Sequence, residues 1–253
     1  MEEKTKITRW KVTDNRFVAF LDILGFKDMV ARNSHHEIYQ LLQKLSEIKE
    51  TVQKAPVNPK IKKQVGDVEV FVVNFSDSIV IFSKNDDINN FHYFILATRW
   101  IFTSAIKNGI PIKGGFAHGN ISVNKTEQIY FGQPIIDAYL IEEEVNYFGI
   151  VAHNSIDKYV SSIRKDENQA KFSDVMFEAV TPLKCGKIVH TNINWFRIMK
   201  PTNFEELRKK IEDFRFSSTG SPRRYIDNTL EVLEGIKETI LFADLEQKSE
   251  VNE

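Results

Sequence analysis

The chain has 253 residues, 42% of them hydrophobic and 27% charged, with 34 basic residues against 35 acidic ones. This is the composition of a globular protein, and the net charge of −1 argues against broad electrostatic binding of nucleic acid. No apolar run approaches the roughly 20 residues of a membrane-spanning helix, the N-terminal residues lack the apolar core of a signal peptide, and the single Cys185 excludes a disulfide framework. We therefore expect a cytoplasmic protein without a membrane or nucleic-acid partner.

The first part of the chain alternates predicted strands and helices. Residues 17–24 form an apolar run that predicts a strand, and residues 26–53 carry apolar side chains at helical spacing. A loop with two prolines is expected at 55–63. Two strand-like runs then share residues 68–82 around a tight turn near Asn74–Ser78.

The middle of the chain continues this pattern. We expect a helix over 88–107 that Gly109 ends, a strand over 110–123, a short strand over 128–132, a helix over 133–146 and a strand over 149–153.

The last third predicts strands at 174–180 and 186–193 and helices at 203–215 and 225–246. The first six elements follow the order β-α-β-β-α-β. That order predicts an α+β fold with a ferredoxin-like (split βαβ) antiparallel sheet and helices on one face. We expect residues 1–160 to form the core of the domain, and residues 161–253 to be a C-terminal extension of the same domain that ends in a long helix.

Two isolated acids carry the strongest functional signal. Asp22 lies inside the apolar run FVAFLDIL, and Asp77 lies at the turn between two apolar strands. A carboxylate in an apolar strand is costly unless a cation or hydrogen bonds compensate it. In a split βαβ sheet the first strand lies beside the hairpin, so the two acids can face each other across a divalent metal ion. The alternative is that Asp22 caps the following helix and Asp77 is an ordinary turn residue.

A second signal follows Asp22 in the segment ILGF. Gly25 and Phe26 lie where the predicted strand leads into a helix, and backbone N–H groups at such a point can hold a phosphate. The alternative is a tight turn in which glycine is present for its backbone angles.

Five short segments, in order, resemble the class III nucleotidyl cyclases. They are FLDILGF (20–26), NFSDSIVIF (74–82), IKGGFAHGN (112–120), IYFGQPIIDAYLIEE (129–143) and GIVAHNSI (149–156). The resemblance covers residues 17–160 and implies the class III cyclase fold. It also implies a homodimer with active sites at the interface, and a separate effector protein that responds to the cyclic nucleotide.

The same resemblance assigns roles to the residues around the acids. It implies that Asp22, Asp77 and the backbone of Ile23 bind two metal ions per site, Mg²⁺ or Mn²⁺. It further implies that the triphosphate of a nucleoside triphosphate substrate is held by the backbone of the segment that follows Asp22, namely Ile23, Leu24, Gly25 and Phe26.

Four positions depart from the family pattern. Ile136 and Leu140 stand where the family has a transition-state Asn and Arg, and Val73 and Ile129 stand at its two purine-reading positions. These apolar side chains cannot hydrogen-bond a phosphate or the polar edge of a purine. Metal-binding acids without purine-reading residues are similar to the bacterial pyrimidine (uridylate or cytidylate) cyclases of anti-phage Pycsar systems.

The expected reaction therefore converts UTP or CTP into the 3′,5′-cyclic monophosphate and pyrophosphate, and generates a second messenger in bacterial anti-phage defence. One alternative is an adenylate or guanylate cyclase. The other is a non-catalytic cyclase-like binding module, against which the retention of both acids argues.

Four basic residues complete the set of candidates. Lys113 replaces the Arg of the family's glycine-containing strand and would neutralise the leaving pyrophosphate. Arg99 would reach phosphate from its helix, or else is a surface residue whose stem packs on Trp100. Arg223 and Arg224 open the C-terminal helix against the preference of the helix dipole, which hints at a bound anion; ordinary surface charges are the alternative.

Overall fold

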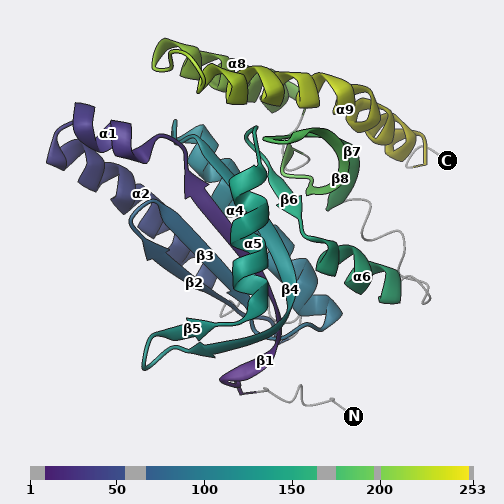
Figure 1. Cartoon of the computed structure of the whole chain (residues 1–253). Helices are drawn as coiled ribbons and strands as arrows, with labels where there is room; N and C mark the ends of the chain where they lie inside the picture. The colour runs from purple at the N-terminus through teal and green to yellow at the C-terminus, as the bar shows by residue number, and fades with distance from the viewer. Residues whose placement is uncertain (1–8, 55–66, 164–174, 197–200, 251–253) are drawn as a thin grey trace.

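The computed structural model describes residues 9–54, 67–163, 175–196 and 201–250 (Figure 1). The loop expected at 55–63 lies outside these residues. The strands are β1 (Thr13–Ile23), β2 (Val70–Phe75), β3 (Ser78–Ser83), β4 (Ile112–Asn124), β5 (Ile129–Phe131), β6 (Ile150–Ala152), β7 (Met176–Leu183) and β8 (Gly186–Ile193). The helices are α1 (Phe26–Arg32), α2 (His35–Lys54), α4 (Ile88–Lys107), α5 (Gln133–Glu144), α6 (Asn154–Ile163), α8 (Pro201–Asp213), the 3-10 turn η3 (Phe214–Phe216) and α9 (Arg223–Glu250).

All strands of the described chain belong to one sheet, in the order β2-β3-β1-β4-β6-β8-β7, with β5 paired to β4. Strand β1 runs antiparallel to both β3 and β4, and β2 runs antiparallel to β3. This is the strand order of a split βαβ sheet, so the expected ferredoxin-like α+β fold is confirmed. The pairing of β4 with β6 is parallel.

The C-terminal strands continue the same sheet, because β8 pairs with β6 and β7 pairs with β8. A side-chain contact fixes this part to the first half: the Thr103 hydroxyl on α4 donates to the carbonyl of Trp195, and the Trp195 ring packs 4.9 Å from that of Phe102. Helices α8 and α9 lie beyond the end of the sheet at which β1 leads into α1 (Figure 1).

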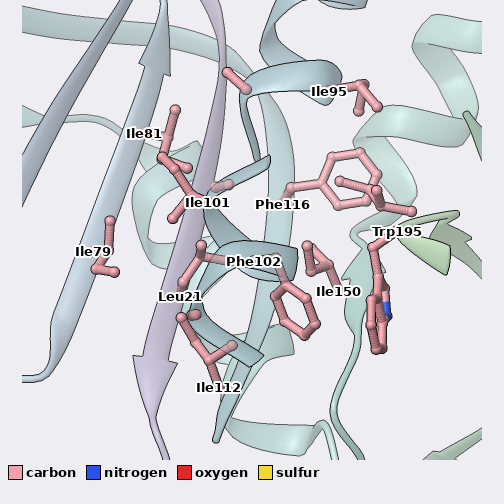
Figure 2. Packing of buried hydrophobic residues seen from close by; sticks show 14 of the residues in the cluster. Leu21, Ile79, Ile81, Ile95, Ile101, Phe102, Ile112, Phe116, Ile150 and Trp195 are labelled. Atoms are coloured by element: carbon pink, nitrogen blue, oxygen red, sulfur yellow. The ribbon is translucent and has the colours of Figure 1, made fainter. Parts of the chain in front are cut away.

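Alternation along β1 divides its side chains between two apolar layers. Phe17, Leu21 and their odd-numbered neighbours pack with α2, α4 and α6, as Figure 2 shows for Leu21 against Ile101 and Phe102. Val18 and Phe20 pack on the other face, with Ala138 of α5. Helices therefore cover both faces, which corrects the expectation of one covered face. Asp22 shares the parity of Val18 and Phe20, so its side chain lies on the α5 face.

The predicted helix over 26–53 is two helices. Asn33 ends α1 with an extended backbone, and its N–H donates to the Met29 carbonyl. Ser34 and Glu37 then form a capping box that starts α2: the Glu37 carboxylate accepts from the Ser34 N–H at 2.8 Å, and the Ser34 hydroxyl accepts from the Glu37 N–H at 3.3 Å. The sequence did not predict this break, because apolar residues continue at helical spacing across it.

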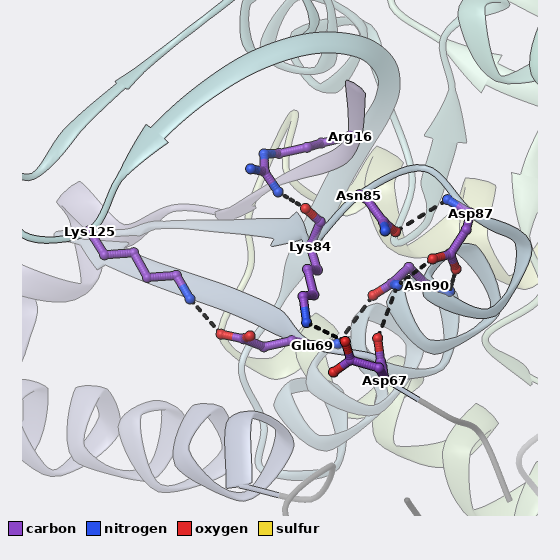
Figure 3. Close-up of polar contacts among 8 residues, drawn as sticks. All are labelled: Arg16, Asp67, Glu69, Lys84, Asn85, Asp87, Asn90 and Lys125. Carbon is purple, nitrogen blue, oxygen red and sulfur yellow. Dashed lines mark hydrogen bonds and ion pairs between the residues drawn. The ribbon is translucent and has the colours of Figure 1, made fainter. Parts of the chain in front are cut away.

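A polar cluster fixes the end of the sheet opposite Asp22 (Figure 3). Buried Arg16 donates to the carbonyls of Ser83 and Lys84, and the Lys84 ammonium forms an ion pair with Asp67 at 2.8 Å. Asp87 caps α4 by accepting from the Asn90 N–H at 2.8 Å. These bonds hold β1, β3 and α4 together.

Two consecutive glycines in β4 allow its neighbours to approach. A Cβ on Gly115 would lie 2.4 Å from the Ala138 carbonyl oxygen and 2.7 Å from the Glu142 nitrogen, both backbone atoms of α5. A Cβ on Gly114 would lie 2.3 Å from a Leu21 methyl group on the other face. Glycine at position 115 therefore lets α5 lie directly on the sheet, which brings Glu142 to the site described next.

Candidate active site

Asp22 and Asp77 lie together at one end of the sheet. Asp22 is the penultimate residue of β1 and pairs with Ser78, the first residue of β3. Asp77 is in the turn between β2 and β3, next to Ser76, which has a left-handed backbone (φ 56°). The N–H of Ile23 donates to the Asp77 carbonyl at 3.1 Å. The expected juxtaposition of the two acids is therefore present.

Asp22 is not a helix cap. The N-cap position of α1 is Gly25, which has a left-handed backbone (φ 71°), and no side chain caps this helix. The capping alternative is wrong for Asp22, so another feature must compensate its charge. Gly25 does have the turn conformation for which glycine is favoured.

The cation nearest the acids is already paired. Lys113 lies directly opposite Asp22 on β4. Its ammonium lies 2.9 Å from the Glu142 carboxylate and donates to the Glu142 carbonyl at 2.7 Å. The Lys113 and Glu142 side chains are 4% and 1% exposed. Lys113 therefore joins α5 to the sheet beside Asp22, and its charge is shared with Glu142.

The electrostatic surroundings of Asp22 favour its neutral form. Burial raises its pKa, the carboxylates of Glu142 and Asp77 raise it further, Lys113 lowers it, and Glu143 adds a smaller rise, so that the pKa lies at about 7. Burial likewise raises the pKa of Glu142, against the opposing effect of Lys113. The end of β1 thus carries more negative charge than its own cations balance.

Oxygen ligands and excess negative charge fit a magnesium-type ion. Within the described ranges, no group of three or more His, Cys, Asp or Glu side chains could by itself hold a metal ion. Two carboxylates are what Mg²⁺ commonly receives from a protein when substrate phosphates and water complete its shell. Asp22 and Asp77, joined by the hydrogen bond from the Ile23 N–H to the Asp77 carbonyl, match that type of site.

The backbone after Asp22 is partly engaged. The Ile23 N–H donates to Asp77, and the Leu24 N–H donates to the Pro111 carbonyl at 2.9 Å. Neither of these two groups is available to a phosphate in this conformation. A phosphate at this turn would therefore be bound by the next two N–H groups, those of Gly25 and Phe26.

The remaining predicted residues are spread over the fold. Arg99 is 5% exposed on α4, which covers the face opposite the Asp22 side chain, so Arg99 is neither a surface residue nor part of the acid site. Val73 lies on the α5 face of β2. Ile129 lies on β5, which pairs with the end of β4 remote from Lys113, so one chain does not bring Ile129 to Asp22.

Two residues near the acids were not predicted. Glu142 was noted only as part of a matching segment, and its effect on Asp22 depends on the docking of α5. Tyr225, near the start of α9, has a pKa raised mainly by burial; Lys184 lowers it, and Glu142, Glu143 and Asp22 raise it. The C-terminal helix therefore reaches the surroundings of the acid site. No local sequence pattern marks such a contact.

Replacing Asp22 by Asn is expected to raise the melting temperature of the metal-free protein at pH 8. The pKa of Asp22 is about 7 when folded against a model value of 3.8, so folding binds a proton between these values. Stability from this group is lost as the pH rises through 7, and Asn removes that loss. The measurement is thermal denaturation from pH 5 to pH 8. The melting temperature of the wild type should fall below that of Asp22→Asn by an amount that grows with pH.

The matched control is Asp28→Asn, which removes an exposed acid of α1. It should leave the pH dependence unchanged. Mn²⁺ at pH 8 should raise the melting temperature of the wild type more than that of Asp22→Asn. A constant difference between wild type and Asp22→Asn over this pH range would contradict the assigned electrostatics.

The same fold occurs in solved guanylyl cyclase domains. The catalytic core of a rhodopsin-guanylyl cyclase with converted specificity, in complex with ATPαS, superposes with a TM-score of 0.50 at 17% identity, over 74% of this chain and 98% of that chain. The guanylate cyclase domain of RhGC from Catenaria anguillulae, in complex with GTP, gives 0.50 at 16% identity, over 72% and 96%. The chain thus has the fold of class III nucleotidyl cyclase domains.

No protein-family model matches the sequence, and no curated protein does. Among the residues that the structure describes, no helix is both long and apolar enough to cross a bilayer.

Proposed function

We propose that the protein is a nucleotidyl cyclase that converts UTP or CTP into the 3′,5′-cyclic monophosphate and pyrophosphate. The observation that carries this proposal is the adjacency of Asp22 and Asp77 at the end of β1 and β3, in a fold shared with guanylyl cyclase domains. The acids occupy the positions of the two metal ligands in the resembled family.

Asp22, Asp77 and the backbone of Ile23 would hold the metal ions. Bound there, two Mg²⁺ or Mn²⁺ ions would lower the pKa of the ribose 3′-hydroxyl and neutralise charge on the phosphates. Phosphoryl transfer depends mainly on positioning and charge neutralisation, so few reactive side chains are needed. Asp22 must give up its proton before it binds a metal ion. Its raised pKa opposes this step, and the positive charge of a metal ion at the site would offset that cost.

The role proposed for Lys113 becomes indirect. Its ammonium is bound to Glu142 and to a carbonyl rather than directed to solvent. We therefore assign it to positioning: it holds α5 against β4 and lowers the pKa of Asp22. Arg99 is not retained as a catalytic residue, because it is buried on α4, which covers the face of the sheet opposite the Asp22 side chain.

The pyrimidine preference rests on the two apolar residues at the purine-reading positions, Val73 and Ile129. Neither can pair with the polar edge of a purine, and an unpaired polar group costs about 1–3 kcal/mol when buried. The cyclase domains with the same fold are bound to ATPαS and GTP, which makes a purine cyclase the second candidate.

A homodimer follows from the proposed site. Ile129 pairs with Asn124 at one end of β4, whereas Asp22 pairs with Lys113 at the other end. A site that contains both residues therefore needs a second copy of the chain. The face that carries Asp22 also exposes apolar side chains: Phe75, Leu140 and Tyr139 are 81%, 54% and 43% exposed. Burial of such a surface stabilises association. The cyclic nucleotide would act on a separate effector protein in bacterial anti-phage defence.

With Mn²⁺ and each of the four common ribonucleoside triphosphates, we expect UTP or CTP to be cyclised at least about tenfold faster than ATP or GTP, because a purine leaves its polar edge unpaired. The measurement is chromatography of the products with authentic 3′,5′-cyclic standards. Val73→Lys should not create a good adenylate cyclase, because Ile129 remains apolar. Faster turnover of ATP or GTP by the wild type would replace the pyrimidine assignment with the purine one. Absence of any metal-dependent product would remove the cyclase proposal.

A further inference from the structure

The C-terminal extension forms one wall of a cavity of about 710 Å³ beside the acid site. The other wall is the start of α1 and the turn before β4, through Gly25, Arg32 and Pro111. The extension contributes η3, the segment Ser217–Thr219 and the first turn of α9. This volume is in the range of small-molecule binding sites.

Three arginines line the cavity and come from three separate elements. Arg32 lies in the last turn of α1, Arg215 in η3, and Arg223 at the start of α9. Arg223 donates to the carbonyls of Ser218 and Arg215, and Arg215 is paired with exposed Asp227. Within the described chain, neither Arg32 nor Arg223 has a carboxylate partner, so their charges are available to an anion.

The lining is suited to a phosphate in other respects. Three consecutive hydroxyl residues, Ser217, Ser218 and Thr219, line the same cavity. The Ser217 hydroxyl donates to the Phe214 carbonyl at 3.1 Å, and the hydroxyls of Ser218 and Thr219 can donate to phosphate oxygens. The single acid of the lining, Asp28, is outnumbered by the three guanidinium groups. Guanidinium groups bind phosphate through charge-assisted and often paired hydrogen bonds.

The cavity adjoins the acid pair. Leu24 and Gly25 line it, and they follow Asp22 by two and three positions. Tyr225 lines it as well, and its phenol is influenced by the charges of Asp22 and Glu142. A chain of phosphates that starts at the acids would reach the cavity at Gly25.

The proposed reaction also needs a source of positive charge that the sheet does not supply. Leu140 stands at the position of the family's transition-state Arg, and Lys113 is committed to Glu142. A nucleoside triphosphate carries several negative charges on its terminal phosphates. Arginines of the extension would neutralise these phosphate charges, because α5 and β4 provide no free cation for them.

We propose that this cavity binds the β- and γ-phosphates of the nucleoside triphosphate, with Arg223 and Arg32 as direct ligands and Arg215 as a supporting one. The proposal rests on the nucleotidyl cyclase function and gives the C-terminal extension a part in the active site. The leaving pyrophosphate occupies the same cavity when the bond between the α- and β-phosphates breaks.

The test compares wild type with Arg223→Gln and Arg32→Gln. The control is Arg224→Gln, which removes another exposed arginine, at the neighbouring position outside the cavity lining. Binding of inorganic triphosphate is measured by calorimetry in EDTA, so that neither metal binding nor catalysis contributes. Each cavity variant should raise Kd about tenfold or more, whereas Arg224→Gln stays within about twofold of wild type. Arg223→Lys should restore part of the affinity.

Kinetics with the preferred nucleotide give a second measure. Loss of a phosphate ligand should lower kcat/KM about tenfold. The loss appears in KM where the contact is equal in the ground and transition states, and in kcat where the contact strengthens in the transition state. Arg32→Gln guards against a folding defect, since the Arg32 side chain makes no hydrogen bond or ion pair within the described residues. Melting temperatures equal to wild type confirm that both variants are folded.

The outcomes separate the two proposals. Triphosphate binding that depends on Arg223 and Arg32, without turnover of any nucleotide, supports the cavity and removes the cyclase function. Turnover with an unchanged kcat/KM in both variants overturns the cavity and leaves the cyclase. Equal weakening by Arg224→Gln also overturns the cavity, because general surface charge then explains the binding.

Discussion

Asp22→Ala and Asp77→Ala are each expected to lower the rate of nucleotide cyclisation at least about a thousandfold, because metal-assisted charge neutralisation supplies most of the catalysis in phosphoryl transfer. Both carboxylates lie at the end of β1 and β3. The measurement is the initial rate of cyclic-nucleotide formation with Mn²⁺, together with the melting temperature of each variant. The folded state should persist, since each substitution removes an acid from an already acidic site.

A mixing experiment sharpens this prediction. Both acids of one site come from the same chain, so mixed dimers of Asp22→Ala and Asp77→Ala should stay inactive. Glu47→Ala, which removes an exposed acid of α2 outside the cavity lining, should retain full activity. Full activity in either acid variant, or recovery on mixing, would exclude the proposed metal pair.

Glu142→Leu is expected to destabilise the protein by about 3–5 kcal/mol, because it leaves the Lys113 ammonium buried without its ion-pair partner. The two side chains are 1% and 4% exposed, so solvent cannot take over the lost interaction. The free energy of unfolding from urea titration measures the effect. Lys113→Met should be destabilising for the converse reason, since Glu142 then stays buried beside Asp22.

The double variant Lys113→Met/Glu142→Leu is the control for this pair. Replacing both charges by apolar groups removes the uncompensated charge, so its loss of stability should be well below the sum of the two single losses. Additive losses would show that the ion pair is not coupled. A Glu142→Leu variant as stable as wild type would contradict the buried position of Lys113.

The adjacency of Asp22 and Asp77 could be predicted from the sequence, because it follows from local patterns. An acid inside an apolar strand is conspicuous, and the β-α-β-β-α-β order fixes which strands are neighbours. Asp22 and Asp77 therefore met as expected although 55 positions separate them (77 − 22). Helix α4 also has the predicted bounds, because Asp87 caps its start and Gly109 (φ 75°) follows its end.

Other parts depend on contacts that no local pattern records. Lys113 was expected to meet phosphate, but its partner Glu142 lies 29 positions later on a helix whose apolar stripe is weak. The direction of the Arg99 side chain could not be predicted, because the exposed face of α4 itself carries apolar residues: Leu96 is 45% and Trp100 is 49% exposed. The break between α1 and α2 was readable in Ser34 and Glu37, but helical apolar spacing outweighed it.

The pairing of β1 with β4 runs unbroken from Thr13 to Ile23. Because side chains alternate, a slip of β1 by a single residue would turn Asp22 into the apolar layer beneath α4 and expel Phe17 and Leu21 from it. A carboxylate without a partner in that layer is far costlier than one at the open end of the sheet. The proposed metal ligand therefore also acts during folding, as the residue that makes the wrong strand register unfavourable.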